Sequence, residues 1–562
     1  MTNDPEAARV YHERTKHTFE SVRGSTHRLL WDIQPLPFKI YTKLEPIPLP
    51  RDFGRVSVPT LEAISASGEG EGGVLDVRSL ARVLQYSAGI TKERSQGDRR
   101  MYFRAAPCTG ALYHIDIYVV CGDLPGNGAT DLSGGVYHFG PHDFALRRLR
   151  AGDHRGALVA ATAAEPSVRR APATLIFAST FWRNAWKYQS RAYRHCWWDG
   201  GTMIAHTLAV AAAEKVAARV VMGFVDHEVA RLVGLDEQRE AALALVSLGG
   251  DREIAGSVQS ARSLDGAEAL PVGELAPLDF ETLALSSREV DYPAIREMHA
   301  ASSLPDAESV RRWRESEPPA SESAGPTRAS SVGSRDARDE PARPARDDGA
   351  SSQQRATDVE LPPLVVRPDV ELDRTVAKRG STRTFAQVPI PAPTLGSLLH
   401  TSLEPVPFDV RPSGGPAFDD VYLILNAIEG VDAGTYAVCR TDVRGAALRL
   451  ERLRVGSFRR EAGYLGLGQD IPADASADVY FLADLDALLS RYGARGYRVA
   501  QLEAAIHGGR VYLAAYALGL GASGLTFFDD DVTAFFSPHA EGKSVMFLVA
   551  VGVPRKRSLA GV

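Results

Sequence analysis

The sequence predicts an α+β protein made of two diverged copies of one domain that pack together as a pseudo-dimer. Three observations predict this fold class. The chain has 562 residues, enough for two or three hydrophobic cores. A polar segment, residues 303–362, divides it into two domain-sized blocks, and both blocks carry the same signals in the same order. We therefore expect an N-terminal segment (1–74), a first domain (75–302), a linker (303–362) and a second domain (363–562).

The composition is that of an ordinary globular protein, with 44% hydrophobic and 24% charged residues. A net charge of −6 offers no electrostatic footprint for nucleic acid. The N-terminal stretch lacks an apolar signal core, and no run of about 18 apolar residues occurs, so neither secretion nor membrane insertion is indicated. The four cysteines lack CxxC or Cys/His metal spacing, which favours reduced thiols and a cytoplasmic location; they are Cys108, Cys121, Cys196 and Cys439.

The segment from 303 to 362 is rich in Ser, Pro, Arg, Asp and Glu. It has almost no apolar side chains whose burial could offset the entropy of ordering it. We therefore predict a disordered linker here.

The recurrence is sharpest in one predicted helix. WKYQSRAYRHCWWDGG from Trp186 aligns with the stretch that follows Ser490, which pairs Lys187 with Arg491 at an offset of 304 residues. Each helix continues into a long Ala- and Leu-rich stretch and ends at a Phe-Asp turn, Phe224–Asp226 in the first block and Phe528–Asp530 in the second. These patterns predict long buried helices followed by strands.

The correspondence also extends upstream. APCTGALYHIDIYVV from Ala106 aligns with RPSGGPAFDDVYLIL from Arg411, and each is a glycine turn that leads into an alternating strand. Three matches in one order at nearly constant spacing indicate duplication and divergence.

The second block begins with the pattern RxSxR, formed by Arg379, Ser381 and Arg383. Two guanidiniums and a hydroxyl suit a phosphate, although such triplets alone are common on surfaces. Downstream, ALGLGASGLTFFDDD supplies a glycine-rich turn where backbone N–H groups can approach a planar ligand. The block then ends in a basic cluster of Arg555, Lys556 and Arg557.

This order of motifs resembles the nitroreductase superfamily. The resemblance implies an FMN cofactor, with Arg379, Ser381, Arg383 and Arg555 at its phosphate and with a turn of Leu525, Thr526 and Phe527 facing flavin N5. In that superfamily FMN lies at a dimer interface, where a loop of the other subunit contacts the ring. The matching loop here lies in the first block and consists of Pro107, Cys108, Thr109 and Gly110.

The two blocks differ in what they retain. The first has no RxSxR equivalent, whereas the second has an altered loop, RPSGGPAF, and carries Arg491 where the first has Lys187. We therefore expect one complete FMN site per chain.

Three stretches together resemble SagB-type azoline dehydrogenases: the N-terminal stretch YHERTKHTFESVRGSTHRLLWDIQPLPFKIYTKLEPIPLP, then TGALYHIDIYVV and AWKYQSRAYR. The resemblance implies FMN-dependent oxidation of thiazolines or oxazolines in a ribosomal precursor peptide, a cyclodehydratase complex as partner, and a catalytic pair matching Lys187 and Tyr188. A homo-oligomer is also compatible. The chain departs from that family at Cys108–Thr109, where Ser-Ala is usual, and at His114, where Pro is usual, and these changes leave substrate identity open.

The roles within the catalytic pair stay open at this point. Oxidising an azoline removes a proton and a hydride, and either side chain could take the proton if its pKa fell. Tyr188 is slightly preferred, with Lys187 lowering its pKa or polarising the azoline nitrogen. Two other functions also remain open: a flavin enzyme that reduces nitro compounds or enones or oxidises another peptide-derived bond, and a non-catalytic scaffold.

Other conspicuous residues of this helix are interpreted as structural. Arg191, Tyr193 and Arg194 recur in the second block, where the catalytic pair does not. His195 and His206 lack an acidic partner at metal-binding spacing, so no metal site is expected.

Overall fold

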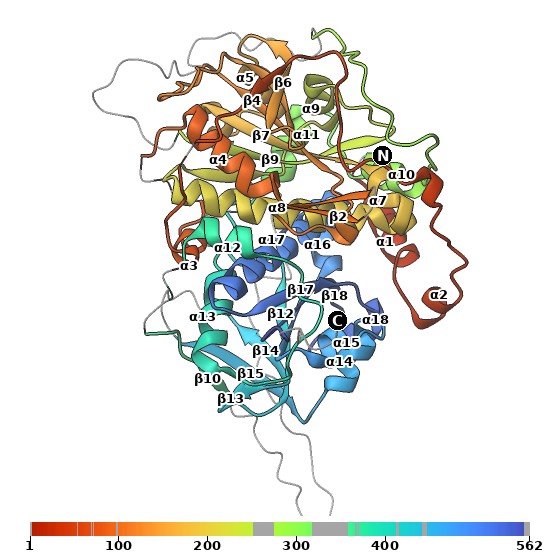
Figure 1. The fold of residues 1–562 in the computed structure, drawn as a ribbon. Coiled ribbons are helices and arrows are strands. Elements are labelled where there is room, and N and C mark those ends of the chain that lie inside the picture. Colours follow the sequence, from red (N-terminus) through yellow and green to blue (C-terminus); the bar gives the residue numbers. More distant parts are fainter. Residues whose placement is uncertain are drawn as a thin grey trace, which may run out of the picture.

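The computed structural model describes residues 3–52, 54–68, 70, 72–96, 99–250, 275–316, 358–365, 368, 370–411, 415–440 and 447–555. The two halves lie one above the other in Figure 1, each with its own sheet, and two long helices run between them. Within these ranges no helix is both long and apolar enough to cross a membrane.

The first half contains an antiparallel seven-stranded sheet. Its strands run mostly through apolar residues, and β4, β7 and β9 are buried along their whole length. The order across the sheet is β1 (Pro46–Pro48), β6 (Ala145–Ala151), β5 (Gly135–Gly140), β4 (Ile115–Cys121), β7 (Ala173–Thr180), β9 (Glu240–Leu248) and β8 (Ala218–Val221).

The second half repeats this sheet strand for strand. The equivalent order is β10 (Val359–Leu361), β15 (Leu448–Val455), β14 (Gly434–Cys439), β12 (Asp420–Leu425), β16 (Ala477–Ala483), β18 (Ser544–Gly552) and β17 (Gly521–Leu525). The predicted α+β architecture of two copies is confirmed.

Helices cover the sheets and connect their strands. Ahead of residues 317–357 the chain contains α1 (Pro5–Arg14), α2 (Phe19–Arg23), α3 (Thr60–Ser65), α4 (Val77–Ala88), α5 (Arg155–Ala161), α6 (Pro166–Arg170), α7 (Phe181–Tyr188), α8 (Ala192–Ala213), α9 (Asp226–Val233), α10 (Pro293–Ala301) and α11 (Ala307–Arg314). After those residues it contains α12 (Leu372–Lys378), α13 (Ala392–Ser402), α14 (Arg459–Leu465), α15 (Asp470–Asp474), α16 (Leu485–Tyr492), α17 (Arg495–Ala517) and α18 (Asp529–Phe536).

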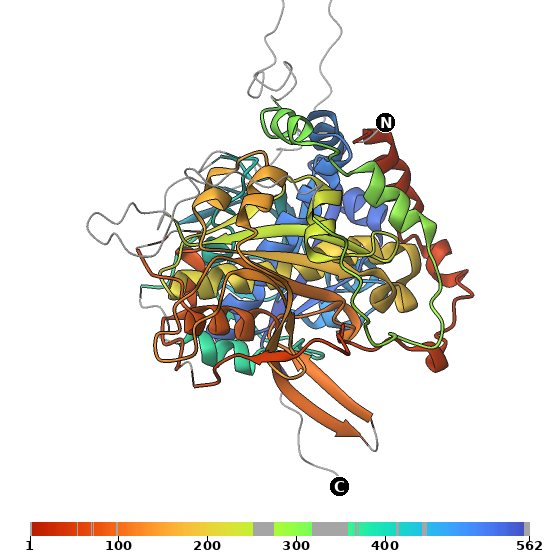
Figure 2. The ribbon, with the colours of Figure 1, turned by 90° about the horizontal axis from the view of Figure 1, so that it is seen from above.

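Shorter elements complete the fold. Short 3-10 turns span Trp31–Ile33, Thr109–Ala111 and Gln189–Arg191, and a small parallel pair joins β11 (Ile390–Pro391) to β13 (Ile428–Glu429). The hairpin of β2 (Ile90–Gln96) and β3 (Arg99–Arg104) projects from the body of the molecule in Figure 2.

The segment predicted as a linker contains an ordered part at each end. Helix α11 lies near its start and β10 near its end, while residues 317–357 lie outside the described residues.

Helices α8 and α17 form the centre of the pseudo-dimer (Figure 1). Both are buried almost throughout, and apolar and small residues lie beside buried charged side chains such as Arg194 and Arg498. A Cβ atom added to Gly201 would lie 2.6 Å from the Cβ atom of Ala505, and one added to Gly509 would lie 2.7 Å from that of Ala205. These pairs are equivalent by the offset of 304, so the two helices cross at the pseudo-twofold axis and require glycine there.

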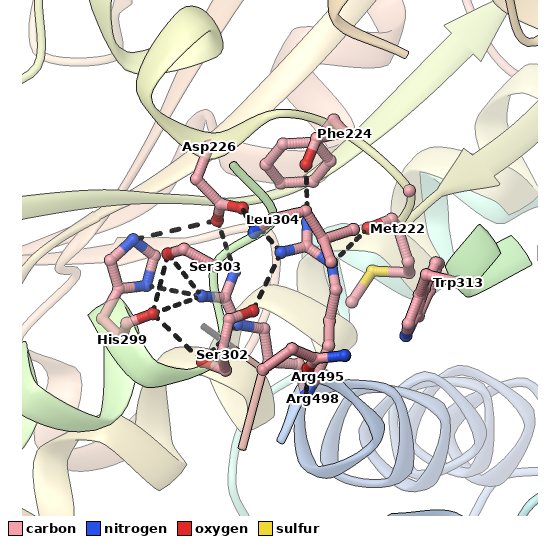
Figure 3. Close-up of polar contacts among 12 residues, drawn as sticks. Met222, Phe224, Asp226, His299, Ser302, Ser303, Leu304, Trp313, Arg495 and Arg498 are labelled. Carbon is pink, nitrogen blue, oxygen red and sulfur yellow. Dashed lines mark hydrogen bonds and ion pairs between the residues drawn. The ribbon is translucent and has the colours of Figure 1, made fainter. Parts of the chain in front are cut away.

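Buried carboxylates join the halves reciprocally. Asp226 of the first half accepts from Arg495 Nη1 at 2.7 Å and from Arg498 Nη1 at 2.6 Å (Figure 3). In the second half, Asp529 accepts from Arg191 Nη1 at 3.1 Å and from Arg194 Nη1 at 2.5 Å. Burial alone would raise the pKa of each carboxyl, but the paired guanidiniums hold both pKa values well below the ordinary range.

A helix from each copy completes these clusters. Arg194 donates through Nε to Thr15 Oγ1 and through Nη2 to the carbonyl of His12, at the end of α1. Arg498 makes the same two bonds with Ser302 and His299, at the end of α10 (Figure 3). Helix α10 is therefore the counterpart of α1, at an offset of 287 residues, and it opens the second copy ahead of the residues outside the described ranges.

Candidate functional site

The residues predicted to bind phosphate lie beside the C-terminal strand of the second half. Ser381 and Arg383 are exposed on the segment that follows α12, and Arg555 is exposed just after β18. The backbone N–H of Arg555 donates to the carbonyl of Thr384 at 3.0 Å. The structure thus brings the RxSxR segment and the terminal basic residue together, whereas Lys556 and Arg557 lie outside the described residues.

Arg379 takes a different position from the other members of its motif. Its guanidinium is buried and donates through Nε to the carbonyl of Ala105 at 2.6 Å and through Nη2 to that of Arg104 at 2.9 Å. Burial also lowers its pKa. In this structure Arg379 therefore ties the second half to the chain leaving β3, directly ahead of the loop 107–110.

Tyr512 on α17 links two of the predicted elements, and its role was not predicted. Its hydroxyl accepts from the backbone N–H of Gly524 and lies 3.4 Å from Ser381 Oγ. The side chain thereby joins the RxSxR segment to β17, whose end leads into the glycine-rich turn.

That turn presents polar groups that lack a protein partner. Leu525 and Phe527 are buried, and the Phe527 ring lies 5.7 Å from Trp198 and 5.5 Å from the guanidinium carbon of Arg191. Among the described residues, Thr526 Oγ1 and the Nε and Nη2 atoms of Arg191 are buried and make no hydrogen bond. Buried donors of this kind are usually satisfied, so a polar ligand fits this wall of the site.

The loop from the first half is held by Asp199 on α8. Its carboxylate accepts from the Thr109 backbone N–H at 2.9 Å, from Thr109 Oγ1 at 2.8 Å and from Cys108 Sγ at 3.0 Å. Pro107 is fixed at its carbonyl by Thr202 Oγ1 at 3.2 Å. Asp199 lies about 90 positions from the loop in sequence, so only the fold could identify it.

Gly110 brings this loop against the predicted catalytic pair. Its φ is +64°, and an added Cβ would lie 2.9 Å from Tyr188 Oη. A larger residue at this position would therefore be strained and would collide with the phenol.

Lys187 and Tyr188 end α7, where the chain turns sharply at Gln189. Lys187 Nζ lies 5.2 Å from the centre of the Tyr188 ring. Burial, followed by the charge of Arg383, lowers the pKa of Lys187, while burial raises the pKa of Tyr188. The charge of Arg383 also favours a lower pKa for Tyr188, so the guanidinium of the phosphate segment lies within electrostatic reach of the pair. These directions favour Lys187 as the base, against the slight preference for Tyr188.

The equivalent position in the first half is filled by protein groups. The backbone N–H groups of Met222 and Gly223, which correspond to Thr526 and Phe527, donate to Asp409 at 2.8 and 3.0 Å. Arg314 Nε pairs with the same carboxylate at 3.0 Å. Tyr492, the counterpart of Tyr188, is buried against the ring of Trp313 at 5.7 Å. The two pseudo-symmetric positions are therefore unequal, one closed by the chain itself and one with unsatisfied donors.

Comparison with known proteins agrees with this architecture. The model of the nitroreductase family matches residues 376–553. A protein of Anabaena variabilis assigned to the nitroreductases has 24% identity and a TM-score of 0.69, and the match covers 98% of this chain and 99% of that one. No curated protein matches the sequence.

Two further solved structures match over less than half of this chain. A protein of Ralstonia eutropha assigned to the nitroreductases has 20% identity and a TM-score of 0.27, covering 38% of this chain and 98% of its own. The microcin synthetase McbBCD complex of E. coli, with truncated pro-MccB17 bound, gives 19% identity and a TM-score of 0.28, covering 44% and 95%. The full-length fold match and the repeated seven-stranded sheet show that the chain carries the nitroreductase fold as two tandem copies, and the family model matches within the second copy.

Proposed function

We propose that this protein is an FMN-dependent oxidoreductase that converts azoline rings of a ribosomally made peptide into azoles. The observation that carries the proposal is that Arg383 of the second half acts electrostatically on Lys187 and Tyr188 of the first. Unsatisfied donors of Thr526 and of Arg191, whose guanidinium lies 5.5 Å from the Phe527 ring, add to it. The nitroreductase-family match supports an oxidoreductase that uses FMN. The resemblance of the Lys-Tyr helix and its flanking stretches to SagB-type dehydrogenases supports the azoline substrate.

The residues present fit such a cofactor. Arg383, Ser381 and Arg555 would hold the phosphate, because they are exposed on adjoining backbone and offer charge-assisted donors. Thr526 and Arg191, with their unpartnered donors, would contact the polar edge of the ring system. Arg379 would act through the backbone of residues 104 and 105, which it binds, and so would position the loop 107–110. When bound, FMN supplies the acceptor for the hydride that leaves the azoline.

Lys187 is assigned as the base that removes the ring proton. Its neutral amine takes the proton from one azoline ring carbon. The hydrogen on the neighbouring ring carbon leaves with both bonding electrons as hydride. Tyr188 keeps its proton, since burial raises its pKa, and its hydroxyl is available to donate to the azoline nitrogen. Gly110 leaves room for that hydroxyl next to the loop.

Mass spectrometry of a cyclised peptide tests this function. The flavin-loaded protein should convert an azoline-containing peptide into a product lighter by two hydrogens, about 2 Da per ring. If the loaded protein instead reduces nitro compounds or enones and leaves every azoline peptide unchanged, the azoline proposal is wrong. If it holds no flavin under any condition, a scaffold role replaces the enzyme.

Arg383→Ala is expected to weaken FMN binding. A charge-assisted bond to phosphate contributes about 1.5–3 kcal/mol, which corresponds to roughly ten- to a hundredfold in Kd. Fluorescence titration of the flavin-free protein with FMN measures this change. Arg374→Ala is the matched control, because Arg374 is an exposed arginine on the adjoining helix α12 that pairs with Glu371. Equal Kd values for the Arg383 variant and the wild type would remove Arg383 from the phosphate site.

The assignment of Lys187 as base predicts a pH dependence. The amine must be neutral to accept a proton, so kcat/KM should rise with pH until the pKa of Lys187, which lies below its ordinary value of 10.5. The measurement is azoline oxidation by FMN-saturated protein across a pH series. This ascending limb should be lost in the residual activity of Lys187→Gln. A wild-type profile that falls with pH over the same range would exclude a lysine base.

A further inference from the structure

Three potential metal ligands converge on α8 where it meets the loop that follows β3. They are Cys108 of the loop, His114 at the start of β4 and Asp199 of α8, and one ligand atom of each lies within 4.8 Å of the others. Asp199 Oδ2 is 3.0 Å from Cys108 Sγ and 2.8 Å from His114 Nε2. His114 and Asp199 are buried and Cys108 is part-buried.

Each of these side chains is also held by a second group that keeps its ligand atom in place. The backbone N–H of Tyr113 donates to Cys108 Sγ at 3.0 Å, and Ser179 Oγ lies 2.8 Å from His114 Nδ1. The Thr109 backbone N–H donates to both carboxylate oxygens of Asp199, to Oδ1 at 2.9 Å and to Oδ2 at 3.0 Å, and Thr109 Oγ1 donates to Oδ1 at 2.8 Å. Asp199 Oδ2 therefore faces this N–H together with the sulfur and the imidazole. His114 and Asp199 thus have partners on the atoms that face away from the cluster, an arrangement characteristic of protein metal sites because it fixes the orientation of each ligand.

We propose that Cys108, His114 and Asp199 form a site for a divalent metal ion of the zinc class. Sulfur, imidazole nitrogen and carboxylate oxygen are the donor set that Zn²⁺ takes, at about 2.0–2.3 Å from the metal. Ligand atoms around such an ion lie roughly 3.3–3.8 Å apart, so the observed cluster needs to open by less than about 1 Å. Binding releases the thiol proton to solvent and requires a neutral imidazole.

Three protein ligands leave one coordination position of a tetrahedral ion for water or another small ligand. The site borders the loop 107–110, so an occupying ion would fix the loop that faces the catalytic pair. The absence of CxxC or Cys/His spacing in the sequence does not bear on this set, because the third ligand comes from a helix 85 positions beyond His114.

At the two corresponding positions that the structure describes, the second copy carries carboxylates paired with arginines. Asp419 stands where the first copy has His114, and it pairs with Arg440 at 2.7 Å. Glu503 stands where the first copy has Asp199, and it pairs with Arg411 at 2.7 Å. Arginine partners neutralise these carboxylates, so the proposed metal site is specific to the first copy and the chain should bind one ion there.

Zinc titration of the full-length protein tests the proposal without reference to the azoline reaction. The protein is freed of metal with a chelator, incubated with Zn²⁺ alone and desalted. Its zinc content is then measured by inductively coupled plasma mass spectrometry. We expect about one zinc per chain for the wild type, and a loss of at least tenfold in affinity for Cys108→Ala and for Asp199→Asn. Cys439→Ala, which removes a part-buried thiol of the second copy, should retain the zinc.

A second measurement uses only the wild type and does not depend on the folding of a variant. Zn²⁺ should slow alkylation of Cys108 at least tenfold, as followed by peptide mass spectrometry, and should leave Cys439 unaffected. Retention of no zinc by the wild type, zinc binding unchanged in Cys108→Ala, or equal protection of both thiols would each overturn the proposal. In those cases the cluster is a hydrogen-bonded network that only orders the loop.

Discussion

Replacing Lys187 by alanine is expected to leave the bound flavin spectrum intact and to lower azoline oxidation by roughly 10²–10⁴-fold. The expected loss is this large because the amine removes the substrate proton and no other group has been assigned that step. Tyr188→Phe should also lower the rate and retain the flavin, since it removes only the hydroxyl near Gly110. Single-turnover absorbance of the flavin, with azoline peptide in excess, measures the chemical step.

Arg491→Ala supplies a control from within the same chain. Arg491 occupies the helix position equivalent to Lys187. Its Nε donates to the carbonyl of Ser316, in the half of the pseudo-dimer whose site is filled by Asp409 and Arg314. Its removal should have little effect on the rate. If this variant is as inactive as Lys187→Ala, or if Lys187→Ala keeps full activity, the asymmetric model is wrong.

Asp226→Asn is expected to produce the largest loss of stability. The substitution leaves Arg495 and Arg498 buried without their counter-charge, and breaking a buried ion pair in this way costs about 3–5 kcal/mol. Because both arginines belong to the other half, the loss should loosen the interface between the copies. Chemical denaturation followed by fluorescence measures the shift.

Asp486→Asn is the matched control for this experiment. Asp486 also pairs with an arginine, Arg9, but its side chain is 74% exposed, and such surface pairs contribute little. An unfolding midpoint for Asp226→Asn equal to that of the control would show that the reciprocal clusters do not hold the halves together.

The recurrence in the sequence was sufficient to predict two copies, because local patterns such as the Lys187 and Arg491 helices survive divergence. It did not reveal that α10 is the counterpart of α1. That pair has an offset of 287 rather than 304, since the insertions between it and the core differ in the two copies. A search at a single spacing therefore misses it.

The candidate site was predictable only where a motif is continuous in the chain. Ser381 is joined through Tyr512 to β17, the strand that leads into the Thr526 turn, but the pattern could not show that Arg379 turns toward the backbone of Ala105. Asp199 and Tyr512 were missed because each binds a segment distant in sequence. Asp199 binds Thr109, and Tyr512 lies beside Ser381. The preference between Lys187 and Tyr188 depended on burial, which no sequence motif encodes.

The ratio of flavin to protein tests the central claim most directly, namely that the pseudo-dimer has one working site. Asp409 and Arg314 close the position at the Met222 turn of the first half, while Thr526 and Arg191 leave donors open at the equivalent turn of the second half. The protein saturated with FMN and desalted should therefore contain one flavin per chain, measured as released FMN against protein by amino-acid analysis. Two flavins per chain would show that the closed position also binds the cofactor and would contradict the account.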